Sequence, residues 1–171
     1  MSGVHAIRRL VRYDRSAFEA FERSSRRLGW RRAIANREIA HRSIKDTLVH
    51  ILNVHEVWLV AAAQGRWEEV FRNPKRQPAA VRSFSDLEQY RRATWAAIDP
   101  LVHRLTEARL DRRVKVPWMA GRYTLEDAFY QASFEQAHHL GEVIAVYWQM
   151  DRPPPQMMWV PLLTGVRASV R

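Results

Sequence analysis

The stretch "SIKDTLVHILNVHEVWLVAAAQG", residues 43–65, decides the fold. Ser43 is suited to cap a helix, and Asp46, three residues later, supports the same first turn. Apolar side chains then recur at helical spacing, and Gly65 is a typical helix end. The main stripe contains Leu48, Ile51, Leu52, His55, Leu59 and Ala62, and His50 lies on its flank beside Val54, Val57 and Ala61. One long amphipathic helix is therefore predicted here.

Three further segments predict long helices. The first runs from about His5 to Leu28, where Gly29 ends it. Another starts at Ser85 and reaches Leu105, and Pro100 predicts a kink or break in it. The last starts at Thr124, with Asp127 three residues later, and ends near Met150 because "DRPPP" forbids continuation. Residues 30–42 and 66–82 are expected to be mainly connections, and residues 112–124 a connection with a short extended segment but no sheet.

Four such helices and almost no strand signal predict an all-α protein, a four-helix bundle. The whole chain, residues 1–171, is expected to form one domain. The pattern alone leaves the order of the helices in space open, because the second and third connections are long. Residues 151–171 form an apolar tail that is expected to pack on the bundle or on a second subunit.

Composition excludes several kinds of chemistry. The chain has no cysteine, so disulfides, cysteine-based zinc sites and thiolate nucleophiles are ruled out. Its formal net charge is +10, but the basic residues are scattered and form no block, which disfavours nucleic-acid binding and fits a basic pocket for a small anion better. The longest apolar run, Val57 to Ala63, is too short to span a membrane, and the N-terminus lacks a signal-peptide pattern. A cytoplasmic protein is expected.

The stretch "FEQAHHLGEV", residues 134–143, carries the candidate chemistry. Glu135 and His139 are four residues apart and share one face at the edge of the core-facing stripe, whereas His138 points away. A carboxylate and an imidazole turned inward need partners, and a divalent metal ion would satisfy both. The long helix predicted over residues 43–65 offers His50 or His55 as a third ligand. Two histidines and one carboxylate leave a coordination position of Zn²⁺ open, and Ni²⁺ or Fe²⁺ would also fit.

Simpler interpretations stay open at this point. The Glu135–His139 pair is also typical of a solvated helix face. His55 lies at the centre of its apolar stripe, which favours a hydrogen-bonded core histidine. His5, His41 and His103 are interpreted as surface or packing residues. Trp58, Trp95 and Trp148 are expected in the core.

Three segments resemble the DinB/YfiT-like superfamily. These are "SIKDTLVHILNVHEVWL", "LDRRVKVPWMAGRYTLEDAF" and "FYQASFEQAHHLGEVIAVYWQMDRPPP". The resemblance implies a bundle of up-down-down-up connectivity, often dimeric. It also implies three metal ligands, His50, Glu135 and His139, with Glu135 where the commonest family pattern has histidine. A His, Glu, His set is similar to that of the mycothiol-dependent maleylpyruvate isomerase branch.

The resemblance further implies a metal-dependent enzyme that acts on a small-molecule substrate. The expected reaction is a thiol-dependent transfer or isomerisation, or a hydrolysis. Because the chain has no cysteine, a reacting thiol would come from a low-molecular-weight cofactor, and arginines at the pocket would bind its carboxylates. A non-catalytic binding or interaction protein on the same scaffold is the alternative.

Overall fold

Four long helices carry the fold in the computed structural model, which describes residues 3–160. The helices are α1 (Gly3–Leu28), α2 (Trp30–Ala33), α3 (Ile44–His55), its π-helical continuation η1 (Glu56–Ala62), α4 (Trp67–Arg72), the 3₁₀ turns η2 (Pro74–Arg76) and η3 (Pro78–Ala80), α5 (Phe84–His103), α6 (Glu107–Leu110) and α7 (Leu125–Gln149). Two-residue strands β1 (Arg113–Val114) and β2 (Tyr123–Thr124) pair antiparallel between α6 and α7. The predicted all-α class is confirmed.

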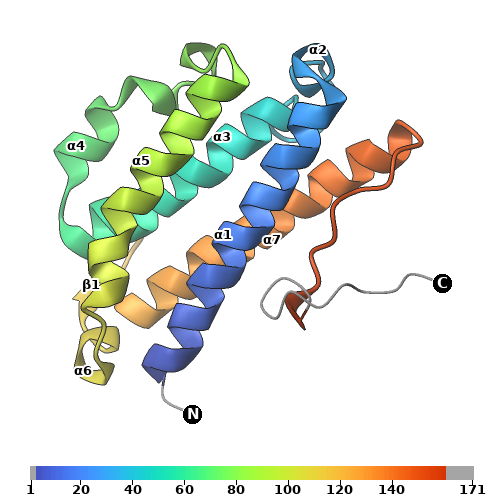
Figure 1. Ribbon diagram of the computed structural model, residues 1–171. Coiled ribbons are helices and arrows are strands. Elements are labelled where there is room, and N and C mark those ends of the chain that lie inside the picture. The colour runs from blue at the N-terminus through green and yellow to red at the C-terminus, as the bar shows by residue number, and fades with distance from the viewer. Residues whose placement is uncertain (1–2, 161–171) are drawn as a thin grey trace.

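The long helices lie side by side. In Figure 1 the chain rises along α1, descends along α3 and again along α5, and rises along α7. Ion pairs join α1 to α5 along their length: Arg91 Nη1 lies 2.8 Å from Glu19, Arg91 Nε lies 2.6 Å from the buried Glu22, and Arg15 pairs with Asp99. No helix within residues 3–160 has the length and apolarity needed to cross a membrane.

Side-chain caps fix where these helices begin. Ser43 Oγ accepts the Asp46 N–H at 3.1 Å, and Thr124 with Asp127 forms a complete capping box on α7, both as predicted. The predicted start of the third long helix at Ser85 was wrong. Ser83 caps α5, since its Oγ accepts the Asp86 N–H at 3.1 Å.

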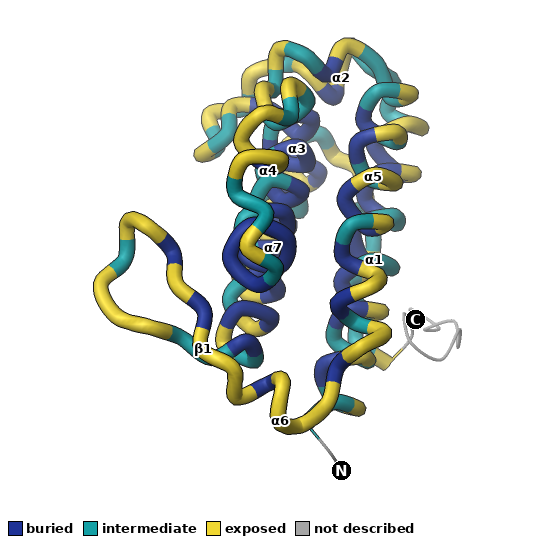
Figure 2. Tube along the Cα trace, turned by 90° about the vertical axis from the view of Figure 1, so that its left-hand side faces the viewer, coloured by how far each residue is buried: buried dark blue, intermediate teal, exposed yellow. Residues whose placement is uncertain are grey.

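Two connections and one helix differ from expectation. Residues 66–82 contain α4, η2 and η3 rather than only a loop. Residues 112–124 form the β1–β2 pair, so the prediction of no sheet was wrong, and Figure 2 shows that hairpin standing out from the bundle. Pro100 does not break its helix, because α5 continues to His103. Proline has no backbone N–H, so α5 lacks one hydrogen-bond donor at Pro100. The Pro100 ring is exposed and therefore causes no steric conflict in the core.

The core consists of two apolar clusters separated by a belt of buried polar side chains. One cluster is centred on residues such as Ile7, Leu59 and Phe129, and the other on residues such as Phe18, Leu52 and Tyr147. The belt contains Asp14, His55, Ser133 and Gln136. His55 Nδ1 donates to the Ile51 carbonyl at 3.0 Å, which confirms the predicted core histidine.

The tail beyond α7 lies against α1 as far as it is described. Tyr13 Oη donates to the Met157 carbonyl at 2.6 Å, and the Tyr13 and Trp159 rings lie 5.0 Å apart. Residues 161–171 of the predicted tail lie outside the described residues.

Candidate metal centre

Three imidazole rings, from α3, α7 and the α2–α3 connection, lie in contact with one another. His50 on α3 stacks on His41 of the α2–α3 connection, with 3.7 Å between ring centroids and 19° between ring planes. His139 on α7 stands across both, 4.5 Å from His50 and 4.8 Å from His41. One nitrogen from each ring lies within 4.8 Å of the others, so the three can contact a single metal ion.

The rings of His50 and His41 are suited to be neutral. Burial, together with the neighbouring His41 and His139 rings, lowers the pKa of His50 to about 4. Burial, followed by the charge of His139, also lowers the pKa of His41. Among the described residues neither ring has a hydrogen-bond partner. Their free nitrogen lone pairs are what a divalent metal ion requires, so the residues present fit such an ion.

Carboxylates flank His139 on both sides. Glu142 Oε2 lies 2.9 Å from His139 Nδ1, and Glu135 Oε2 lies 3.5 Å from His139 Nε2. Because a carboxylate only accepts, the contact with Glu142 places the ring proton on Nδ1 and leaves the Nε2 lone pair toward Glu135. This carboxylate–histidine pair is the arrangement that fixes a ligating imidazole in metal sites.

The structure brings two of the three predicted ligands together and adds a residue that sequence reasoning set aside. His50 and His139 face one another across α3 and α7, and Glu135 lies beside His139. His41 was interpreted as a surface or packing residue; its ring does pack on His50, and it also belongs to the cluster that could hold a metal ion. It lies in an irregular connection, where no periodicity indicates which way a side chain points. His138 is exposed.

A cavity of about 380 Å³ opens beside the cluster. Its lining comes from α3, η1, η2, the β1–β2 hairpin and α7: His50, Asn53, Val54, Val57, Trp58, Arg76, Trp118, Met119, Gln131 and Glu135. The aromatic and aliphatic side chains form apolar walls, and Arg76 is the cationic group. The size and this mixture are typical of a small-molecule site.

Arg76 is positioned by a buried network around Glu56. The Glu56 carboxylate accepts from Tyr90 Oη at 2.8 Å, from Asn73 Nδ2 at 3.2 Å and from Thr94 Oγ1 at 3.3 Å, and Arg76 Nη1 lies 3.5 Å away. Burial raises the pKa of Glu56, and these donors oppose that rise. The π-helical η1 begins at Glu56, the residue at the centre of this network.

The fold and site together define an all-α bundle with a histidine cluster that can hold a metal ion. The chain belongs to the DinB superfamily, whose family model matches residues 16–143. That range contains His41, His50, Glu135 and His139. It confirms the resemblance to the superfamily for the first two segments quoted above and for the third segment as far as Val143. None of the curated proteins matches the chain.

Proposed function

We propose that this DinB-superfamily protein binds one divalent metal ion through His50, Glu135 and His139 and acts as a metal-dependent enzyme on a small molecule. The observation that carries the proposal is the convergence of imidazole nitrogens from α3, α7 and the α2–α3 connection to within 4.8 Å of one another. Zn²⁺ suits a nitrogen and carboxylate set best, and Ni²⁺ or Fe²⁺ also fits. Such an ion supplies Lewis acidity that favours the deprotonated form of a water or thiol.

His50 and His139 belong to the ligand set on any version of this proposal. Glu135 is chosen as the third ligand because its carboxylate lies beside the Nε2 lone pair of His139 and also borders the cavity. His41 is the competing third ligand. The remaining residues then have separate tasks: Glu142 orients His139, and Arg76 attracts the carboxylate of a substrate or of a low-molecular-weight thiol.

Metal content tests the assignment. The purified chain, stripped with a chelator and reconstituted with Zn²⁺ or Ni²⁺, should retain about one ion, and His50→Ala and His139→Ala should retain none. Glu135→Ala should lose metal, whereas His41→Ala should keep it. If instead His41→Ala lost metal and Glu135→Ala kept it, the third ligand would be His41 and not Glu135. Failure of the wild type to retain either ion would remove the metal centre altogether.

The enzymatic part needs its own test. Wild type loaded with metal is expected to catalyse transfer or isomerisation with a small thiol, or hydrolysis, and to lose turnover on metal removal. Retained metal without turnover on any of these substrate classes would favour the alternative, a non-catalytic binding protein on the same scaffold.

We further propose that the protein forms a homodimer through the outer face of α7. Phe134 is 69% exposed and Trp148 is 61% exposed there, contrary to the predicted core position of Trp148. The small residues Ala137, Gly141 and Ala145 lie exposed between them, which would let a second helix approach closely. A hollow lined by Phe134, Glu135, His138 and His139 adjoins this face, so a second copy would lie next to the metal centre.

A further inference from the structure

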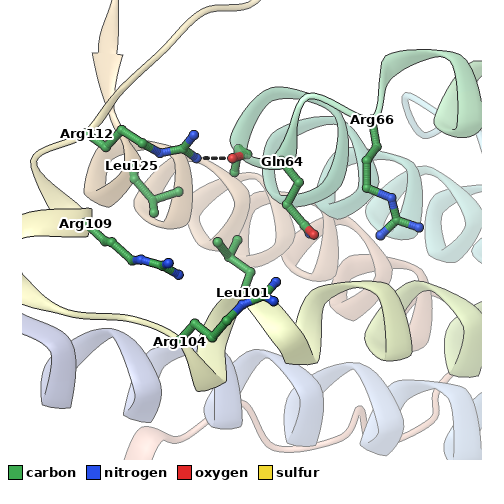
Figure 3. A pocket seen from close by; sticks show the side chains of 8 residues that line it. Gln64, Arg66, Leu101, Arg104, Arg109, Arg112 and Leu125 are labelled. Carbon is green, nitrogen blue, oxygen red and sulfur yellow. Dashed lines mark hydrogen bonds between the residues drawn. The ribbon is translucent and has the colours of Figure 1, made fainter.

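A second cavity, of about 330 Å³, lies at the end of the bundle where α5 and α6 end and α7 begins. It shares no lining residue with the cavity beside the histidine cluster. Four arginines from separate segments line it: Arg66 after η1, Arg104 after α5, Arg109 within α6 and Arg112 before β1. Figure 3 shows their guanidinium groups coming from different sides around Leu101 and Leu125.

Most of this positive charge has no carboxylate to balance it. The cavity lining contains neither aspartate nor glutamate. Arg66 pairs with Glu69, and the Arg112 guanidinium donates to the Ala63 carbonyl, a neutral partner. Within residues 3–160 neither Arg104 nor Arg109 forms an ion pair. Guanidinium groups stay protonated at any ordinary pH, so three of them face one cavity with their charge uncompensated.

The rest of the lining is shaped for an organic molecule rather than a free ion alone. Leu125 is fully buried and Leu101 nearly so, and they give the cavity an apolar floor. Gln64 Nε2 donates to the Leu59 carbonyl at 2.7 Å and to the Ala97 carbonyl at 3.0 Å, which fixes its carboxamide. In Figure 3 the side-chain oxygen of Gln64 lies between Arg66 and Leu101, where it can accept a hydrogen bond from a ligand hydroxyl.

We propose that this cavity is a binding site for a small organic phosphate. A phosphate group accepts several charge-assisted hydrogen bonds from guanidinium forks, and Arg104, Arg109 and Arg112 offer such forks from three directions. A compact, hydroxylated remainder of the ligand would contact Gln64 and the leucine floor. A nucleic-acid backbone fits less well, because it requires a basic stripe on the surface rather than an arginine-lined hollow with an apolar floor.

Calorimetric titration of the full-length chain with glycerol phosphate, inorganic phosphate and citrate, at physiological salt, tests the site. Glycerol phosphate is expected to bind at one site per chain. The double variant Arg104→Gln/Arg109→Gln should weaken it by about tenfold or more, since each lost charge-assisted contact has an effect of roughly that size. Among the described residues neither side chain forms an ion pair with another element, so folding should persist. The control Arg12→Gln/Arg82→Gln removes the same charge from exposed positions elsewhere and should bind as wild type does.

Titration of His50→Ala separates this site from the metal centre, because phosphate also coordinates metal ions. Binding should be unchanged in that variant. Equal weakening in the two double variants, loss of binding in His50→Ala, or no saturable binding of any probe would each overturn the proposal. Tighter binding of citrate would assign the site to polycarboxylates instead. An oligonucleotide that outcompetes glycerol phosphate and depends on Arg104 and Arg109 would assign it to nucleic acid.

Discussion

At the scale of single residues, Glu142 is the side chain whose role is most specific. It accepts from His139 Nδ1 at 2.9 Å and so sets which nitrogen of that ring is free. Glu142→Gln keeps the shape but removes the charge, and metal affinity should fall about 10- to 100-fold, as for other partners of ligating histidines. Competition with a chromogenic chelator measures this. The exposed Glu68→Gln on α4 is the control, and an affinity unchanged by Glu142→Gln would contradict the role.

The contact of Tyr90 with Glu56 leads to a prediction about how stability depends on pH. Its hydroxyl donates to the buried Glu56 carboxylate and helps to hold the pKa of that group down against the effect of burial. In Tyr90→Phe the pKa of Glu56 in the folded state should rise further. Folded Glu56 then stays protonated up to a higher pH than in wild type, so the variant loses more stability than wild type as the pH rises. The loss in unfolding free energy should be about 1–3 kcal/mol near pH 7.5 and smaller near pH 4. Urea unfolding at both pH values measures it, and an equal loss at both would contradict the coupling.

Residues inside regular helices could be placed from the sequence, and residues in connections could not. The facing of His50 toward the last helix, and of His139 inward, follows from periodicity and from the resemblance. Glu56 lies one residue beyond the core histidine on the same helix, but its burial depends on partners from α5 and the η2 region. His41 shows the same limit, since only the tertiary fold stacks it on His50.

At the scale of elements, the start of α5 can be tested directly. Ser83 adopts an extended backbone and its Oγ accepts the Asp86 N–H, whereas Ser85 is exposed within the first turn. Ser83→Ala should therefore lower the free energy of unfolding by about 0.5–2 kcal/mol. Ser85→Ala should change it by only a few tenths, as at most exposed helix positions. Thermal or urea unfolding distinguishes them, and a larger loss for Ser85→Ala would restore the boundary expected from the sequence.

The same helix start shows why element boundaries are harder to predict than elements. Both serines are followed by an acid three residues later, Asp86 and Glu88, so the capping pattern fits either one. Ser83 is the residue that caps α5, because Asp86 also accepts the Arg82 N–H at 3.0 Å and so strengthens this helix start. Helices α4 and α6 are too short to show periodicity, and they form where tertiary contacts bury Val70 and Leu110.

At the scale of the whole molecule, different kinds of polar side chain gather at different positions along the bundle. The histidine cluster and its cavity lie where α3 and α7 face each other, and the arginine-lined cavity lies at the end where α7 begins. The polar belt of Asp14, His55, Ser133 and Gln136 lies between the two apolar clusters of the core. The net charge of +10 was evident from the sequence, but the gathering of four arginines around one hollow was not, because those residues come from segments joined only by the fold.

The last prediction concerns the proposed dimer, which forms through the outer face of α7. In a symmetric dimer each copy contributes the same face, so one substitution acts twice. Phe134→Glu replaces the most exposed large apolar side chain of α7 by a charge. The dimer then loses the free energy of burying that side chain, about 1.5–3 kcal/mol per copy. Dimer dissociation should therefore become at least about 100-fold easier, and analytical ultracentrifugation at micromolar concentration should show a monomer where wild type sediments as a dimer.

The matched control for that experiment is Ile34→Glu, which places the same charge on an exposed apolar residue away from α7. It should sediment as wild type does. Because Glu135 and His139 border the hollow next to Phe134, dimerisation would also shield one side of the metal centre from solvent. The Phe134→Glu monomer should accordingly release metal to a chelator faster than wild type. A wild-type monomer, or equal dissociation of the Ile34→Glu control, would show that this face of α7 does not form the dimer.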